Sequence, residues 1–206
     1  MRSWNDIPDG ATIERVRAAL TANGFEAQVV ENGAEATAAV QSLIASGSEV
    51  FTMASATVDS IGLGKAINEG SYDSVRNKLN GMDAGKQGRE MRKLGAGPDV
   101  SVGSVHALTE DGKLLIASLT GSQLPAYAYG AGTVIFVIGA NKIVKNLDEA
   151  FKRLEEHVVP LESARARKAY GLPDSFNSRA NKILLLSGEI QSGRVKVVIV
   201  KEALGF

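Results

Sequence analysis

The feature that most constrains the fold is the succession of a strand, a helix and a strand near the start of the chain. Residues 25–30 and 49–53 have the composition of short buried strands, and the apolar residues of 36–44 lie between them at helical spacing. A helical crossover of this kind joins parallel strands, because antiparallel neighbours need only a tight turn. The order therefore predicts an α/β fold, a mostly parallel sheet flanked by helices.

Later apolar runs supply further strands of such a sheet. Three runs are expected to be strands: 133–138, 182–186 and 194–200. The first of these, Thr133–Ile138, is the most convincing buried strand in the chain because it is continuously apolar and β-branched. Two short strands from Ser101 onward flank Glu110-Asp111-Gly112, and the Asp-Gly pair predicts a tight hairpin turn between them.

Helices are predicted around these strands. The first has Ile13, Val16 and Leu20 on one face and stops at Asn23-Gly24. The others are expected over most of 59–96 with breaks at Gly70, Gly81, Gly85 and Gly88, over 124–129, from a capping-box start at Asn146 through Val158, and after Leu161. Residues 1–206 are expected to form a single domain, with a small helical lid around residues 70–96.

Composition excludes several classes of function. Lys plus Arg and Asp plus Glu each total 23, so the net charge is zero and no nucleic-acid partner is expected. The chain has no cysteine, which excludes disulfides, thiolate nucleophiles and clusters held by its own thiolates. Two histidines are too few for a dedicated zinc site, so we expect no metal site. No apolar run is long enough to cross a bilayer and no signal-type stretch follows Met1, so we expect a cytoplasmic protein without a membrane partner.

Two glycine-rich segments resemble nucleotide-binding loops but fail in detail. The segment 62–66 has Gly-Leu-Gly-Lys-Ala, whereas a phosphate-binding loop needs a glycine where Asp59 stands and a hydroxyl where Ala66 stands. The segment Gly130-Ala131-Gly132 precedes its strand, whereas the dinucleotide fingerprint follows one. We therefore expect neither triphosphate hydrolysis nor a standard dinucleotide cofactor.

Three polar turns that contain glycine are the best candidates for a binding site. Small hydroxyls, glycines and free backbone N–H groups grip a carboxylate or phosphate, although the same hydroxyls can simply cap helices. The candidate residues are Ser55, Thr57 and Gly62 in the first turn, Thr120, Gly121 and Ser122 in the second, and Gly139, Asn141 and Lys142 in the third. If the turns converge on one cleft, Lys142 neutralises a small anionic metabolite and Asn141 orients it.

Acidic residues and a histidine are candidates for chemistry. Glu110 and Asp111 lie together on the predicted hairpin turn, where one could act as nucleophile or general base, although turn acids are usually only solvated. His106 shares a predicted strand face with Val102 and Leu108, which favours a packed or hydrogen-bonded role over a catalytic one.

Several of these strings together resemble the LUD (lactate-utilisation) domain family, whose best-known branch is lactate utilisation protein C. The strings are Ser55-x-Thr57 with Gly62, Ala107–Gly112 with Leu114, Gly121 with Ala126–Gly130, Val134–Val144, and Gly193–Glu202 with Leu204–Phe206. The resemblance implies an α/β fold similar to the sugar isomerase and CoA-transferase superfamily. It also implies a role in bacterial oxidation of lactate to pyruvate beside iron–sulfur subunits.

The resemblance leaves three functional hypotheses. The leading one is binding of a small carboxylate or phosphorylated metabolite, with Glu110, Asp111 and Lys142 as the catalytic groups if chemistry occurs. A second is a non-catalytic accessory subunit that docks onto iron–sulfur lactate-utilisation subunits. A third is a CoA-transferase-like enzyme, since class I CoA-transferases use the glutamate of a Ser-Glu-Asn-Gly turn and Thr109–Gly112 is similar. His106 stands where the family is expected to have asparagine. The sequence identifies no cofactor, and it leaves open whether the protein is an enzyme and whether it is a homodimer.

Overall fold

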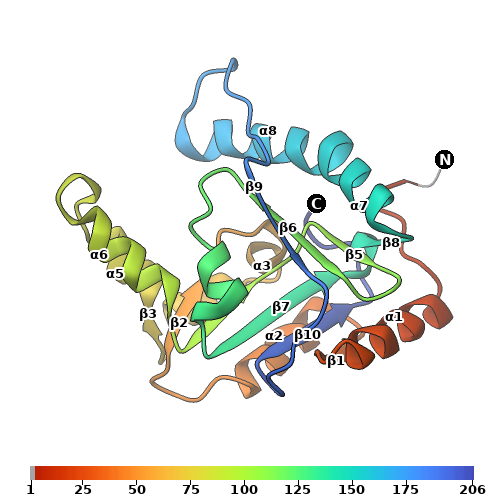
Figure 1. Ribbon diagram of the computed structural model, residues 1–206. Coiled ribbons are helices and arrows are strands. Elements are labelled where there is room, and N and C mark those ends of the chain that lie inside the picture. The colour runs from red at the N-terminus through yellow and green to blue at the C-terminus, as the bar shows by residue number, and fades with distance from the viewer. Residues whose placement is uncertain (1–2) are drawn as a thin grey trace.

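The computed structural model describes residues 3–206, and its elements alternate between strands and helices along most of the chain (Figure 1). The strands are β1 Glu26–Val30, β2 Glu49–Thr52, β3 Asp73–Ser74, β4 Val100–Gly103, β5 Ala107–Thr109, β6 Leu114–Ser118, β7 Thr133–Gly139, β8 Ile143–Val144, β9 Lys182–Leu186 and β10 Val195–Val200. The α-helices are α1 Gly10–Ala22, α2 Gly33–Ser42, α3 Ala56–Ser60, α4 Leu63–Asn68, α5 Val75–Asn80, α6 Ala84–Ala96, α7 Leu147–Arg153 and α8 Val159–Tyr170. Short π-helical segments occur at Ala126–Gly130 (η1) and Leu154–Val158 (η3), and a 3₁₀ turn at Ala140–Lys142 (η2).

Six strands form one parallel sheet in the order β1-β10-β7-β4-β2-β3. Its two central strands, β10 and β7, pair along their length from Val195 opposite Val134 to Val200 opposite Gly139. Both are apolar on both faces, because helices and a second sheet cover them. The predicted α/β fold with a parallel sheet flanked by helices is confirmed.

The first two strands are parallel, as predicted, but they are not neighbours. β10, β7 and β4 lie between β1 and β2. β1 is only partly buried and occupies an edge, whereas every residue of β10 except Lys196 is buried. Burial of the more apolar strands therefore decides the order, and chain proximity does not.

A second sheet of four strands lies against the first, in the order β8-β5-β6-β9. The predicted hairpin is confirmed as β5 and β6, and Gly112 takes the left-handed conformation (φ +79°) that the turn requires. The strand expected from Ser101 is divided: β4 belongs to the parallel sheet and β5 to the second sheet. His106 lies in the connection Ser104–His106 and not on a strand face, so that part of the prediction is wrong.

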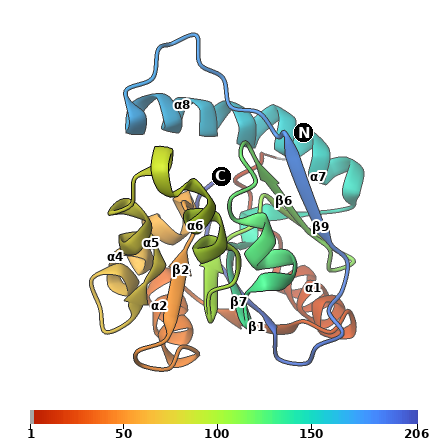
Figure 2. The ribbon, with the colours of Figure 1, turned by 60° about the vertical axis from the view of Figure 1, so that its left-hand side comes forward.

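The parallel sheet has a distinct apolar core on each face. Alternate residues of β7 point into one core or the other. Phe136 faces α1 and the second sheet, whereas Ile135 and Val137 face α2, α3 and α4. A third cluster lies between the outer face of the second sheet and the helical run from α7 to α8, which crosses the top of the molecule in Figure 2. The second sheet is thus enclosed between the parallel sheet and a helical layer.

The predicted helices are found, with local differences. Gly85 and Gly88 lie inside α6, which kinks at Gln87 and is not interrupted by them. The helices expected around residues 147–158 and after Leu161 form one continuous run, because η3 joins α7 to α8 just before Pro160, which has no N–H to donate. α5 and α6 project as a helical pair beyond β3 (Figure 1), and their role as a lid stays a prediction. Among the helices of residues 3–206, none combines the length and apolarity needed to span a membrane.

The start of α7 offers a direct test of helix capping. The Asn146 side chain accepts a hydrogen bond from the Glu149 N–H (3.0 Å), and the Glu149 carboxylate accepts one from the Lys145 N–H (2.6 Å). We expect Asn146→Ala to lower the free energy of unfolding by about 1 kcal/mol, because the Glu149 N–H in the first turn of α7 loses its side-chain acceptor. Urea denaturation measures this loss. Asn146→Asp keeps the acceptor and should remain close to wild type; equal losses in both variants would contradict a capping role.

Candidate functional site

A cavity of about 540 Å³ lies at the carboxyl ends of strands of the parallel sheet. Most of its walls come from five segments: the turn after β2, the connection from β4 to β5, β6 with the turn that follows it, the helical run η3–α8, and the loop after α8. Single residues from α5, η1, η2 and the end of the chain complete the lining. Open α/β sheets bind ligands at this edge, because the loops that follow the strands converge there. The position and size of the cavity make it the candidate binding site.

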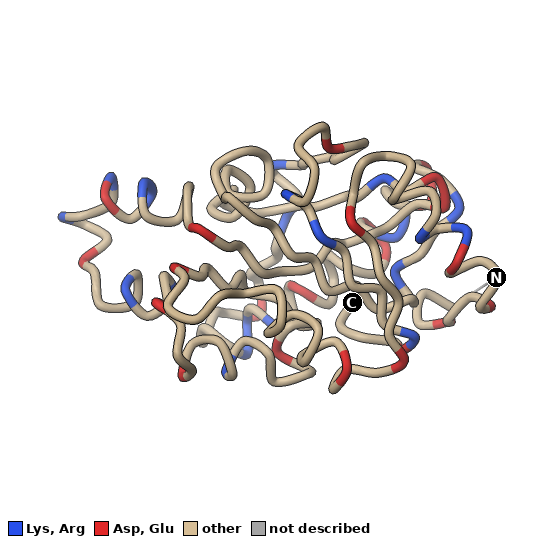
Figure 3. The backbone as a smooth tube through the Cα atoms, turned by 90° about the horizontal axis from the view of Figure 1, so that it is seen from below, with Lys and Arg blue, Asp and Glu red and all other residues tan. Residues whose placement is uncertain are grey.

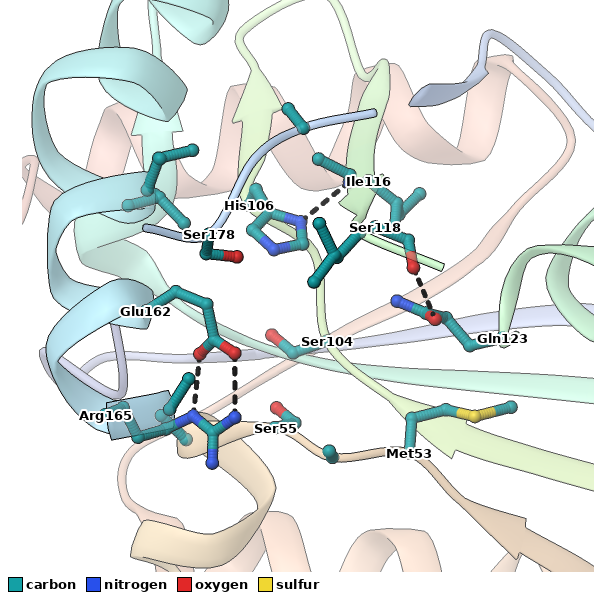
Figure 4. Close-up of a pocket in the computed structure, with 18 of the residues that line it drawn as sticks. Met53, Ser55, Ser104, His106, Ile116, Ser118, Gln123, Glu162, Arg165 and Ser178 are labelled. Atoms are coloured by element: carbon teal, nitrogen blue, oxygen red, sulfur yellow. Dashed lines mark hydrogen bonds and ion pairs between the residues drawn. The ribbon is translucent and has the colours of Figure 1, made fainter. Parts of the chain in front are cut away.

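The cavity has more positive than negative side chains. Arg76, Lys142, Arg165 and Arg179 line it, and Glu162 is the one carboxylate among the described lining residues. That carboxylate is already paired, since it accepts two hydrogen bonds from Arg165 (2.6 and 2.7 Å). Figure 4 shows this pair extending from α8 toward Ser55 and Ser104. The pairing with Glu162 raises the pKa of Arg165, so the guanidinium stays charged.

Charged residues elsewhere are mixed in sign. In Figure 3 positive and negative residues alternate around the outside of the fold, and the projecting pair α5–α6 at its left carries both signs. The positive excess of the cavity is therefore a local feature of a chain whose net charge is zero.

Arg76 is held against the cavity wall by α5. Its Nε and Nη2 donate to the Thr52 carbonyl (3.1 and 2.5 Å), and its guanidinium lies over the Phe51 ring, 5.2 Å from the centroid. These contacts fix the side chain at the end of β2. Arg76 thus brings a permanent charge to the strand edge without a carboxylate partner among its hydrogen bonds.

Lys142 is the most deeply buried cation that lines the cavity, with 2% of its surface exposed. Its Nζ contacts Thr57 Oγ1 (2.7 Å), Ser104 Oγ (3.1 Å) and the Val105 carbonyl (3.0 Å). All three partners are uncharged. Burial, assisted by the positive charge of Arg153, lowers the pKa of Lys142 well below its usual value.

Arg153 lies behind this part of the wall and is fully buried. Its Nη1 donates to the His106 carbonyl (2.6 Å), whereas Nε and Nη2 have no hydrogen-bond partner among the described residues. Burial lowers the pKa of Arg153 to about 10. A buried guanidinium without a carboxylate adds to the positive potential around Lys142.

His106 lines the cavity and is held by the second sheet. Its Nδ1 accepts a hydrogen bond from the Ala117 N–H (3.0 Å), so in the neutral ring the proton is on Nε2. Burial, with the charges of Lys142 and Arg153 nearby, lowers the pKa of His106 to about 3. The imidazole is therefore neutral at physiological pH.

The structure brings part of the predicted site together. Six of the predicted residues line the cavity: Ser55, Thr57, His106, Thr120, Ser122 and Lys142. Gly121 connects two of them in the same turn. Three others lie outside the lining: Gly62 precedes α4 in a left-handed conformation, Gly139 packs closely on the backbone of Leu204, and Asn141 accepts a hydrogen bond from the Leu204 N–H (3.2 Å).

The two predicted acids lie elsewhere. Glu110 and Asp111 are at the tip of the β5–β6 hairpin, which contacts α1 through a hydrogen bond from Asn23 Nδ2 to the Asp111 carbonyl (2.9 Å). The Asp111 carboxylate pairs with Lys113 (2.6 Å), and hydrogen bonds from Lys113 and Thr109 lower its pKa. Neither acid is among the residues that line the cavity.

Sequence reasoning missed several residues of the site. Arg76, Glu162 and Arg165 come from helices for which no binding role was predicted. Gln123 ends the predicted polar turn that contains Thr120 and Ser122, but it was not among the candidate residues. The spacing of Glu162 and Arg165 is a signal for an ion pair on a helix, but such pairs are usually solvated. Within residues 3–206, no group of three or more histidine, aspartate or glutamate side chains is arranged to hold a metal ion.

Comparison with solved structures identifies the class of fold. The chain is similar to a DUF162 family protein from Deinococcus radiodurans, with a TM-score of 0.56 and 12% sequence identity, over 95% of this chain and 99% of that chain. The class is a Rossmann-like α/β domain. The family model of the LUD domain matches residues 13–200, and the chain belongs to the LUD domain family, which is associated with lactate utilisation. No curated protein matches the chain.

Proposed function

We propose that this LUD-domain protein binds a small anionic metabolite, a carboxylate or a phosphorylated compound, in the cavity at the strand ends. The observation that carries the proposal is the charge of the lining, which has three guanidinium groups (Arg76, Arg165 and Arg179) and one carboxylate that is already paired. A cavity with this imbalance favours a negatively charged ligand, because charges that line a cleft concentrate the field inside it.

The arrangement of the lining also suggests how such a ligand lies. The guanidinium groups of Arg76 and Arg165 match the planar geometry of carboxylates and phosphates, and the Ser55 hydroxyl lies near Arg165 (Figure 4). Tyr170 and Phe176 line the same cavity and offer apolar surface. An anion with a small apolar or carbonyl-bearing part fits this combination.

The family association supports a role connected with lactate oxidation to pyruvate, and both compounds are small carboxylates. The CoA-transferase alternative gains no support from the geometry, because Glu110 lies at the hairpin tip outside the cavity lining. The accessory-subunit alternative predicts no ligand of its own. Co-purification with iron–sulfur subunits from native extract, together with an empty ligand screen, would favour that alternative over ours.

A thermal-shift screen tests the proposal. The panel contains lactate, pyruvate, sugar phosphates, CoA and acyl-CoAs, and a ligand at 100 times its Kd should add about 2.7 kcal/mol of stability. We expect one anionic class to stabilise the protein, with an effect that weakens as salt is added. Stabilisation by no member of the panel would overturn the proposal.

Charge variants locate the site. We expect Arg165→Gln and Arg179→Gln each to weaken binding by about tenfold or more, because a hydrogen bond to a charged group is worth about 1.5–3 kcal/mol. Lys86→Gln is the matched control, since Lys86 is 86% exposed and outside the cavity lining. Titration calorimetry with the best ligand measures the affinities. Equal affinity in all three variants would place the anion elsewhere.

A further inference from the structure

The hydrogen-bond partners of Lys142 are three uncharged oxygen atoms, and this set can also satisfy a neutral amine. An ammonium group has three N–H donors, whereas a neutral amine has two donors and one lone pair. The Val105 carbonyl can only accept, and the Thr57 hydroxyl donates its proton to the Leu204 carbonyl (3.2 Å), so both accept from Nζ. The third partner, Ser104 Oγ, lies 3.1 Å from Nζ, where it can accept from Nζ. Its hydroxyl proton can also rotate to donate to the lone pair of a neutral amine. Every polar group is then satisfied without a charge on Lys142.

The surroundings of Lys142 disfavour the charged form. Its three contacts are uncharged, and the charged group that acts on it, Arg153, is positive. His106 is neutral, and the carboxylate of Glu162 is paired with Arg165. An uncompensated buried ammonium is costly, whereas the amine form costs no buried charge.

The amine also borders the space in which a ligand would lie. Lys142, Thr57 and Ser104 all line the cavity, and Figure 4 shows the Ser104 side chain in the space between Ser55 and His106. When the Ser104 hydroxyl rotates away from Nζ, the lone pair becomes free on the side of Ser104, which lines the cavity. The cations Arg76 and Arg165 line the same cavity and can hold the negative part of the ligand.

We propose that Lys142 is a nucleophile that forms a Schiff base with a carbonyl compound that carries a carboxylate or phosphate. The proposal deepens the proposed function and rests on it only for the anionic part of the ligand. A buried lysine that is free of charge is the form of this side chain that attacks carbonyl carbon.

The covalent step is balanced within the site. The Nζ lone pair attacks the carbonyl carbon, the π bond of the carbonyl opens, and one amine proton moves to the oxygen to give a carbinolamine. The carbon–oxygen bond then breaks, and the hydroxide leaves as water with the second amine proton. The product is an imine between Nζ and the former carbonyl carbon, with no change in oxidation state.

Reductive trapping tests the proposal. Glyoxylate and pyruvate are the probes, and sodium cyanoborohydride supplies the hydride that converts the protonated imine to a stable secondary amine. Intact-mass and peptide-mapping spectrometry then locate the adduct. We expect Lys142 to be modified at least tenfold faster than Lys65, whose side chain is 77% exposed. Modification of Lys142 no faster than Lys65 would overturn the proposal.

Variants at two positions sharpen the test. Lys142→Arg keeps N–H donors at this position but cannot form an imine, so the adduct should be lost. Lys142→Met serves the same purpose if the arginine variant fails to fold, with circular dichroism as the folding check. Ser104→Ala removes the hydroxyl that occupies the lone pair and should make trapping faster. Slower trapping in Ser104→Ala would contradict the assigned arrangement. Thermal stabilisation by an anion without an adduct would overturn the Schiff base and leave the proposed function standing. An adduct on Lys142 without stabilisation by any anion would support the Schiff base and overturn the proposed function.

Discussion

Phe136→Ala is expected to lower the free energy of unfolding by about 3–5 kcal/mol, the largest loss among the substitutions considered, because it removes a fully buried aromatic ring and leaves a cavity. Phe136 lies in the middle of β7, with no exposed surface. Its ring is 4.8 Å from that of Tyr127, centroid to centroid, at 59°. It is paired in register with Gly103 on β4, where an added Cβ would come within 1.8 Å of the Tyr127 hydroxyl.

Urea denaturation monitored by fluorescence measures the loss. Phe136→Leu is the control, since it keeps most of the apolar volume and should cost less than about 1.5 kcal/mol. Tyr127 lines the cavity, so the alanine variant should also bind the anionic ligand more weakly. A loss below about 1 kcal/mol in Phe136→Ala would show that the core between the parallel sheet, α1 and the second sheet can collapse around the missing ring.

The second large effect is a loss of stability in acid that depends on His106. The pKa of His106 is about 3 in the folded protein, against an ordinary value of 6.5. The unfolded chain therefore binds more protons than the folded protein between these values, and stability falls as the pH falls. The contribution of neutral His106 to the free energy of unfolding is fully present above about pH 6.5 and is lost progressively toward pH 3. Because solvent still reaches part of His106, we expect the loss of unfolding free energy to be roughly 3 kcal/mol, which is less than the full lowering of its pKa implies.

His106→Asn isolates this contribution. An asparagine Oδ1 can accept the Ala117 N–H in place of Nδ1, but the side chain does not titrate. Unfolding free energies from pH 7.5 to 3.5 should fall more steeply in the wild type than in the variant. His157, whose pKa burial also lowers, and the carboxylates are present in both proteins and cancel in the difference. Parallel curves would mean that His106 is protonated without cost in the folded state.

The sequence was sufficient to predict most of the strands and helices, because local patterns determine them. The two-residue strands β3 and β8 were not predicted. The continuous apolar run of β7, the Asp-Gly turn before Lys113 and the cap at Asn146 all depend on residues within one element or one turn. The order of the sheet was not predictable in this way. β10 lies between β1 and β7. It takes this central position because it is buried on both faces, whereas β1 is only partly buried.

The candidate site was predictable only in part, for a similar reason. The turns at Ser55 and Thr120 follow strands, and their polar residues were identified from that context. Glu162 and Arg165 have the sequence of an ordinary solvated helix, and their place in the cavity depends on how α8 crosses the carboxyl edge of the sheet. Conversely, Glu110 has the sequence of a reactive turn, but the hairpin places it beside α1.

The position of β10 has a consequence for synthesis of the chain. While the ribosome is still making residues 195–200, β1 has no strand partner and one edge of β7 is unpaired, although both edges belong to the interior of the finished sheet. Pairing over such sequence separations is slow, and an open apolar edge can associate with other chains in the meantime. We therefore expect the nascent protein to need protection at the β7 edge until its last strand emerges.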